Sequence, residues 1–156
     1  MRGAAFPALI QASALSFLGK VAGAEGPAPV TPISSRAITT LSIPGYVDFL
    51  APDGRAVWVT NEGRVEKLVH ESSVPVAVVP VPNPCGAMTV AFGSLWVANC
   101  KGSDLYRIDL QSRKVTARIP AGLADPEGEL SLAAGAGSIW VLTDPNGVLS
   151  PHRSGD

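Results

Sequence analysis

The chain is poor in the side chains that most often carry chemistry. Its 156 residues include only two cysteines and two histidines, and Asp, Glu, Lys and Arg together make up 16%. The formal net charge is −1 and the basic residues are scattered, which argues against nucleic acid or an anionic membrane surface as a partner. No Ser-His-Asp or Cys-His spacing, phosphate-binding Gly-rich loop or cluster of metal ligands is present. The sequence therefore offers no ready-made catalytic motif.

Residues 1–24 have the pattern of an export signal. Arg2 supplies the positive start, Ala4–Leu18 the apolar stretch, and Ala22-Gly23-Ala24 the small-x-small cleavage motif. A short membrane helix is the alternative, but the apolar stretch is shorter than the roughly 20 residues needed to cross a bilayer. We expect the signal to be removed, leaving no membrane segment.

The rest of the leader supports an exported, soluble protein. No cysteine lies at the cleavage motif, which argues against a lipoprotein anchor. Residues 25–36 are rich in proline and small residues and are expected to form a flexible lead-in. We therefore expect a periplasmic or secreted location.

One short phrase recurs and contains all three tryptophans of the chain. The tryptophans are 38 and then 44 residues apart, and each follows a glycine closely. Several short strands repeated at about 40 residues are typical of a β-propeller, in which each repeat is a four-stranded antiparallel blade. A β-sandwich is the alternative, but it gives no reason to repeat Trp-Val in phase. The three copies are Ala56-Val57-Trp58-Val59, Ser94-Leu95-Trp96-Val97 and Ser138-Ile139-Trp140-Val141.

Gly, Asp and Asn punctuate the repeats and predict where the strands begin and end. Tight turns are expected at Asp53-Gly54, Phe92-Gly93 and Asn146-Gly147. Residues 37–43 resemble the outer strand of a preceding blade. The predicted strands are 46–50, 57–60, 65–69 and 74–79 in the first repeat, 87–91, 95–98, 105–110 and 115–119 in the second, and 130–134 and 139–142 in the third.

Residues 37–150 supply only two and a half to three blades. Propellers have about four to eight blades, so the smallest closed ring needs more residues than this chain has. Blades bury their faces against neighbours, and an open arc exposes apolar faces at both ends. Either the chain is a piece of a longer protein, or copies assemble through their exposed blade faces.

The last six residues, 151–156, break the repeat. In the second blade the third strand reads Leu-Tyr-Arg-Ile-Asp-Leu, whereas the third blade departs into Pro-His-Arg-Ser-Gly-Asp. These six residues can be encoded by CCG CAT CGA TCC GGC GAC. Read one base later, the same bases give Arg-Ile-Asp-Pro-Ala, whose first three residues match Arg107-Ile108-Asp109 of the second blade. Our hypothesis is a single-base frameshift at this point; chance agreement of the chosen codons is the alternative.

The two cysteines are placed to form a disulfide. If Phe92-Gly93 is a two-residue hairpin loop, residues whose numbers sum to 185 face one another, and Cys85 and Cys100 are such a pair. An oxidising compartment would let the bond form. Two free thiols or a metal pair are the alternatives, although a zinc site would need further ligands nearby.

The second repeat resembles a known family. The phrases Pro84-Cys85-Gly86-Ala87-Met88, Gly93–Cys100 and Leu105-Tyr106-Arg107-Ile108-Asp109 are similar to blades of the virginiamycin B lyase-like (streptogramin lyase) propellers and of YVTN-repeat proteins. The resemblance implies a ring of seven blades. For the true lyases, the resemblance also implies a divalent metal that holds a cyclic depsipeptide and a histidine base that opens its ring by elimination. Those catalytic residues lie in later blades, so none is assigned here.

Polar loops on the ligand face offer candidate binding positions. The loops that join the second and third strands of each blade converge around a propeller's channel, where a small molecule would be held. We take Asn61, Glu62, Asn99, Lys101 and Asp144 as candidates. Simple turn formation by Asn and its neighbours is the alternative.

Three other groups carry less weight. His70 is expected in a solvated turn on the opposite face, and His152 lies in the suspect tail. The acidic loop with Asp125, Glu127 and Glu129 could hold a cation or a basic ligand, or could simply be solvated.

Three functions fit the sequence. The first is a fragment of an exported streptogramin lyase-like propeller that lacks its catalytic blades and is not competent as it stands. The second is a non-catalytic YVTN-type scaffold that binds a ligand or a protein. The third is a lactonase-like propeller, which would need a calcium site in its channel. No cofactor is evident in the chain itself.

Overall fold

The computed structural model describes residues 26, 28–36, 39–122, 132–144, 146 and 148–153. The chain divides into two units, Met1–Arg36 and Ala37–Asp156. The first contains the short 3-10 turn η1 (Ile33–Ser35), and the predicted export signal lies outside the described residues. Within the described part, no helix is long and apolar enough to cross a bilayer.

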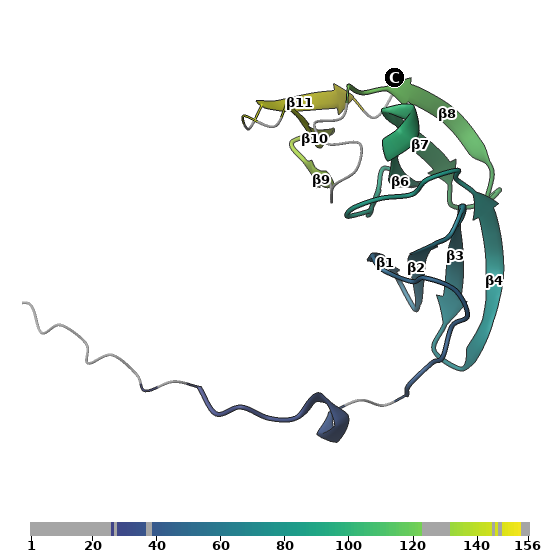
Figure 1. The fold of residues 1–156 in the computed structure, drawn as a ribbon, viewed down its shortest axis with the longest axis vertical. Helices are drawn as coiled ribbons and strands as arrows, with labels where there is room; N and C mark the ends of the chain where they lie inside the picture. Colours follow the sequence, from purple (N-terminus) through teal and green to yellow (C-terminus); the bar gives the residue numbers. More distant parts are fainter. Residues whose placement is uncertain are drawn as a thin grey trace, which may run out of the picture. The chain divides into compact units, whose positions relative to one another are not determined.

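The second unit is built of three antiparallel sheets, which we call blades 1 to 3 (Figure 1). In each, neighbours in sequence are neighbours in the sheet, because short turns join the strands. The all-β architecture of an incomplete propeller is confirmed. Blade 1 holds β1 (Leu50–Asp53), β2 (Ala56–Asn61), β3 (Arg64–Val69) and β4 (Ser72–Pro80); blade 2 holds β5 (Thr89–Ala91), β6 (Ser94–Asn99), β7 (Asp104–Asp109) and β8 (Val115–Pro120); blade 3 holds β9 (Leu132–Gly135), β10 (Ser138–Asp144) and β11 (Val148–Arg153).

The repeated tryptophan has the same local role in each blade. Its indole Nε1 donates a hydrogen bond to the residue five positions earlier, at the end of the preceding strand. Trp58 donates to Asp53 Oδ2 (3.1 Å), Trp96 to the Ala91 carbonyl (3.1 Å) and Trp140 to the Gly135 carbonyl (3.0 Å). The indole ring thus packs on one side of the sheet while its only polar atom stays paired. This contact explains why the phrase recurs in phase with the first hairpin.

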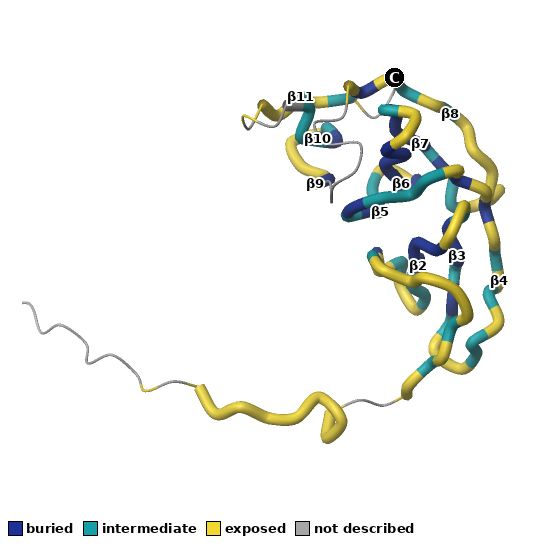
Figure 2. Tube along the Cα trace, viewed as in Figure 1, coloured by how far each residue is buried: buried dark blue, intermediate teal, exposed yellow. Residues whose placement is uncertain are grey.

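The core lies between the blades, where two clusters of buried side chains gather. Figure 2 shows that the buried residues concentrate in the inner strands, whereas the outer strands β4 and β8 are largely exposed or intermediate. Side chains alternate across each sheet, so every blade has an indole face, which carries its tryptophan, and an opposite aliphatic face. The first cluster joins the indole face of blade 1 to the aliphatic face of blade 2, and the second repeats this between blades 2 and 3. The first contains Ala51, Trp58, Val65, Leu95, Val97 and Ile108; the second contains Trp96, Ala98, Leu105, Leu132, Ile139 and Val141.

The first hairpin begins later than the sequence predicted. The innermost strand was expected at 46–50, but β1 spans Leu50–Asp53, and Gly45 before it adopts a φ of 103°. Asp53 was expected in the turn, yet it pairs with Ala56 as the last strand residue. Its carboxylate accepts the indole hydrogen bond and contacts Lys67 Nζ at 2.6 Å. Asp53 therefore belongs to the sheet, whereas Gly54 begins the turn, as predicted, with a φ of 61°.

Other boundaries also moved. The strand predicted at 87–91 is only Thr89–Ala91, because Gly86 turns the chain with a φ of 70°. The described residues of the predicted strand 37–43, from Thr39 on, belong to no strand. By contrast, β11 continues through residues 151–153, the start of the segment that breaks the repeat. The turn at Phe92-Gly93 is confirmed, since Ala91 pairs directly with Ser94.

Candidate functional site

A hollow lies on the loop side of blade 1, where we expected a ligand. Its volume is about 240 Å³. Three segments form it: the approach to β1, the β2–β3 turn and the β4–β5 connection. The lining residues are Tyr46, Asp48, Thr60, Asn61, Glu62, Gly63, Asn83 and Pro84. Two candidates from the sequence, Asn61 and Glu62, therefore lie together in it.

Asn61 shapes the hollow and is itself buried, with 2% of its surface exposed. Its Nδ2 donates to the Pro44 carbonyl (2.9 Å), and its Oδ1 accepts from the backbone N–H of Glu62 (2.8 Å). A Cβ at Gly45 would clash with Asn61 Oδ1, so glycine is required there for space as well as for its positive φ. Asn61 thus fixes the chain that enters β1.

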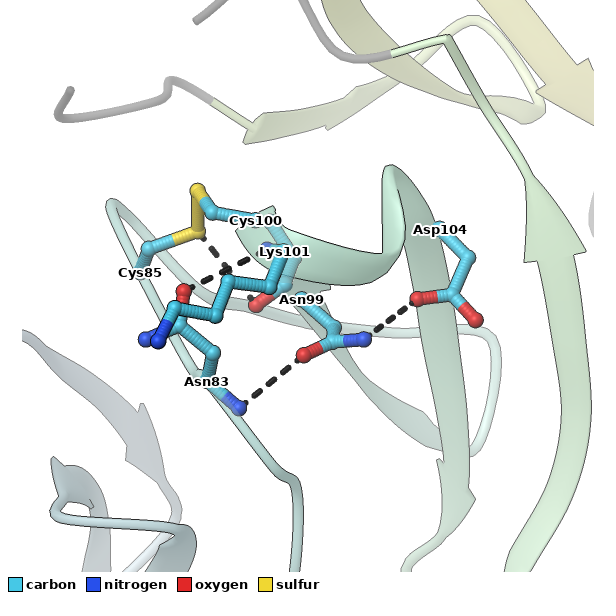
Figure 3. The surroundings of a disulfide bond; sticks show 7 residues. Asn83, Cys85, Asn99, Cys100, Lys101 and Asp104 are labelled. Atoms are coloured by element: carbon cyan, nitrogen blue, oxygen red, sulfur yellow. Dashed lines mark hydrogen bonds between the residues drawn. A yellow bond between two sulfur atoms is a disulfide. The ribbon is translucent and has the colours of Figure 1, made fainter. Parts of the chain in front are cut away.

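Asn99 has the corresponding role in blade 2. It is 3% exposed, its Oδ1 accepts from the Asn83 backbone N–H (2.9 Å), and its Nδ2 donates to Asp104 Oδ1 (2.6 Å). Figure 3 shows this chain of contacts beside the disulfide. Arg118 completes it by donating to Asp104 Oδ2 from Nε (3.0 Å) and Nη2 (2.7 Å). Hydrogen bonding to Asp104 raises the pKa of Arg118. Both buried asparagines therefore have structural partners.

The remaining candidates differ in position. Glu62 is exposed at the hollow, and its carbonyl accepts from Arg64 Nη1 (3.0 Å). Lys101 is exposed in η2 (Cys100–Gly102), where its backbone N–H donates to Asn83 Oδ1 (3.3 Å). Asp144 ends β10 in blade 3, and its side chain lies outside the described part of the structure. The structure brings Glu62 and Lys101 near Asn83.

Three lining residues were missed by the sequence analysis. Tyr46 was assigned to the first strand, and Asp48 and Asn83 were not singled out. Tyr46 is 69% exposed, which is unusual for an aromatic side chain with a wide apolar ring. The signal that could have found them is their place just ahead of an inner strand, on the same side as the asparagine turns.

The disulfide is present, although the register is not the predicted one. Cys85 is bonded to Cys100, with Cα atoms 5.9 Å apart. The sum of 185 holds from Thr89 onward, but before that point Pro84 pairs with Asn99 and the Cys85 N–H donates to the Ala98 carbonyl (3.2 Å). Because β5 begins only at Thr89, the pairing ahead of it is shifted by two residues, and the cysteines lie diagonally across from each other (Figure 3). Such bonds persist in oxidising compartments.

The other sequence candidates lie away from the hollow or cannot be placed. His70 lies in the β3–β4 turn as predicted, and its Nε2 is 2.7 Å from Glu71 Oε1. Asp125, Glu127 and Glu129 fall outside the described residues.

The metal implied by the lyase resemblance finds no ligand set in the described residues. No three side chains of His, Cys, Asp or Glu within that part gather closely enough to hold an ion. Asp48 and Glu62 supply only two carboxylates at the hollow. The described blades therefore do not fit that metal, and no chemical step is derived through it.

No protein-family model matches the chain, and no curated protein matches it. Among solved structures, streptogramin B lyase shares 17% identity over 74% of this chain and 43% of its own, with a TM-score of 0.52. Kluyveromyces lactis Hsv2 with its complete loop 6CD shares 13% over 70% and 33%, with a TM-score of 0.51. BamB from Moraxella catarrhalis shares 16% over 70% and 37%, with a TM-score of 0.45.

The chain spans less than half the length of each of these structures, at 43%, 33% and 37%. At such low identity, the similarity concerns the fold and not the chemistry. The repeated sheets, the packing between them and the matches to streptogramin B lyase and Hsv2 agree with one another. The chain is therefore a partial β-propeller, similar in fold to streptogramin B lyase.

Proposed function

We propose that the chain is part of an exported β-propeller of the streptogramin lyase-like kind, and that its described blades bind a small molecule without transforming it. The hollow of about 240 Å³ on the loop side of blade 1 carries this proposal. The export signal pattern of the sequence and the disulfide support an oxidising location.

The chemistry of the hollow favours a ligand with positive charge or many hydroxyl groups. Asp48 and Glu62 are exposed carboxylates, and no lysine or arginine of the described residues lines the hollow. Tyr46 adds an exposed ring, whose face attracts cations and packs against apolar atoms. The buried amides hold the walls in place, so little ordering is needed on binding.

The proposal that the ligand is not chemically transformed rests on where the histidines of the chain lie. The histidine base that the lyase resemblance implies would have to lie beside the reacting atoms. The two histidines of the chain lie in the β3–β4 turn and in β11, and neither lines the hollow. A lyase with its base in later blades, or a scaffold that binds protein, are the competing functions.

Titration of the full chain with a small basic or hydroxyl-rich probe, spermidine or maltose, tests the hollow, and incubation with a type B streptogramin and Mg²⁺ tests for lyase activity. We expect calorimetry to show binding of the small probe, weakened about tenfold by Glu62→Gln, and chromatography to show no linear product from the streptogramin. Glu71→Gln is the matched control, since Glu71 is exposed in the turn at the other end of blade 1. Ring opening would show that the chain is a lyase after all. No binding, or binding that Glu62→Gln leaves unchanged, would remove the hollow as the ligand site.

A further inference from the structure

The fold contains one joint between blades, used twice. Trp58 of blade 1 packs in the same cluster as Leu95 and Ile108 of blade 2. Trp96 of blade 2 packs in the same way with Ile139 of blade 3. Both tryptophans have 0% of their surface exposed. Each joint therefore places the aliphatic face of one blade on the indole face of the blade before it.

The chain enters each joint in the same way. The outer strand of a blade leads directly into the blade that covers that sheet: β4 leads to blade 2 and β8 to blade 3. The first residue after each outer strand donates a backbone hydrogen bond into the turn of the sheet it leaves. Val81 donates to the Gly63 carbonyl (3.1 Å) and Ala121 to the Ser103 carbonyl (3.0 Å). The segment that completes one sheet with its outer strand therefore also leads to the blade that covers the indole face of that sheet.

Blade 3 presents the acceptor half of such a joint, by which we mean an exposed indole face beside an unpaired sheet edge. Its sheet runs β11-β10-β9, so within the described residues β11 is an edge strand with no outer neighbour. Leu149 lies on the indole face, and 57% of its surface is exposed. Ala133 and Pro151, which flank Trp140 in register, are exposed too. Exposed edges of this kind add strands from other chains.

The donor half, by which we mean an outer strand that leads into an aliphatic face, consists of residues 39–44 and blade 1. Residues 39–44 read Thr-Thr-Leu-Ser-Ile-Pro, and β8 reads Val-Thr-Ala-Arg-Ile-Pro, so both end in a β-branched residue followed by proline. The segment belongs to no strand in the structure, although its sequence is that of an outer strand. It leads into blade 1, whose aliphatic residues Val57 and Leu68 pair in register as Leu95 and Ile108 do in blade 2.

The aliphatic face of blade 1 is loosely covered by the segment itself. Leu41 lines a hollow of about 310 Å³ together with Val57 and Leu68. Leu50 and Val78, on the same face, are 63% and 51% exposed. Moving residues 39–44 to another sheet would therefore uncover an apolar face and at the same time bring it to a complementary one.

We infer that two copies of this chain associate head to tail: residues 39–44 of one copy add as the fourth strand to β11 of the other. The aliphatic face of blade 1 in the first copy then covers the indole face around Trp140 in the second. In a chain of these 156 residues, the partner that covers this edge is a second copy, joined by the contact that the chain already makes twice. Head-to-tail contacts of this type close into rings or extend into open assemblies.

Sedimentation of the full chain over a range of concentrations tests the association. We expect reversible oligomers, and we expect Leu149→Lys to raise the dissociation constant about tenfold or more, because the joint would bury an unpaired charge. Leu149 is exposed in the single chain, so this substitution leaves the fold intact, which circular dichroism can verify. Phe92→Lys is the matched control, since Phe92 is 43% exposed in the first turn of blade 2, outside either half of the joint.

Two further measurements identify the contact itself. The fluorescence of Trp140, followed in a variant with Trp58 and Trp96 replaced by phenylalanine, should shift to shorter wavelength as oligomers form. A synthetic peptide of residues 37–45 in excess should return the oligomers to single chains by occupying β11. A chain that stays monomeric up to about millimolar concentration overturns the inference. So does association that Leu149→Lys leaves unchanged or that the peptide does not compete.

Discussion

Replacing His152 with isoleucine should stabilise the protein. His152 pairs with Ile139 in register, at the position where blades 1 and 2 bury Leu68 and Ile108. Those two side chains are 1% and 0% exposed. The Nε2 atom of His152 is buried and has no hydrogen-bond partner among the described residues. The third blade therefore has a polar ring where its neighbours have an aliphatic side chain.

The size of the effect follows from that unpaired nitrogen. A buried polar atom without a partner costs about 1–3 kcal/mol, and an isoleucine would add apolar contact in the same place. Because part of the ring remains accessible, we expect His152→Ile to raise the free energy of unfolding by about 1–2 kcal/mol. With a urea m-value of about 2 kcal/mol per molar, the midpoint should rise by about 0.5–1 M.

Urea unfolding followed by circular dichroism provides the assay. His70→Ile is the matched control, because His70 has 62% of its side chain exposed in a turn and should gain nothing. A midpoint for His152→Ile that equals or falls below the wild type would refute the reasoning. It would mean that blade 3 does not share the packing of blades 1 and 2 at this register position.

The residue before His152 extends the same argument. Lys67 lies over the Trp58 ring at 5.6 Å and Arg107 over the Trp96 ring at 5.4 Å, whereas Pro151 pairs with Trp140. Pro151→Arg should therefore add about 0.5–1 kcal/mol, measured in the same way. Together the two substitutions recreate the Arg-Ile pair that the hypothesised alternative reading frame would encode. An additive gain in the double variant would support that frame as the one selected for folding.

Three further predictions follow from single contacts. Replacing Cys85 and Cys100 together by serine should lower the free energy of unfolding by about 3 kcal/mol, the value for a closed loop of 15 residues, as measured by thermal or urea unfolding. Equal stability of the wild type and the serine variant would contradict the idea that the disulfide stabilises the fold by restricting the unfolded chain. Gly45→Ala should lower stability by at least about 1 kcal/mol, because its Cβ would meet Asn61 and its φ is 103°, and an unchanged midpoint would count against both causes. The hydrogen bond from Lys67 is the chief reason why the pKa of Asp53 lies below its ordinary value. The Asp53 carboxylate therefore stabilises the folded state at pH values above its unfolded-state pKa, and this contribution is lost as the pH falls through the lower folded-state pKa. Acid titration of the unfolding midpoint should be less steep in Asp53→Asn, and parallel curves would disprove the link.

The fold could be predicted because the blades repeat. Trp58, Trp96 and Trp140 recur with their glycines, and periodic side chains in short strands leave few architectures possible. The turn at Phe92-Gly93 followed from local chemistry and was confirmed. The pairing of the cysteines was also correct, but the register was wrong, because an irregular stretch after Gly86 cannot be counted from the sequence.

The candidate site was less predictable. Asn61 and Asn99 were expected in loops, but they end β2 and β6, and their side chains are buried and bonded to neighbouring groups of the protein. A sequence pattern shows an amide at a turn and does not show which way it faces. Tyr46 and Asp48 were missed since nothing local distinguishes a strand residue from one that enters a strand. Their place became clear only from contacts distant in sequence.

The disulfide also determines how the chain would respond to mechanical force. It links the β4–β5 connection to the start of η2, residues 15 positions apart, with Cα atoms only 5.9 Å from each other. A fully extended chain spans about 3.4 Å per residue, so pulling on the two ends of the oxidised protein would release about 45 Å less contour than pulling on the reduced one. All of that hidden length lies in blade 2. Under tension, the middle blade would retain a covalently closed loop after both of its neighbours had fully extended.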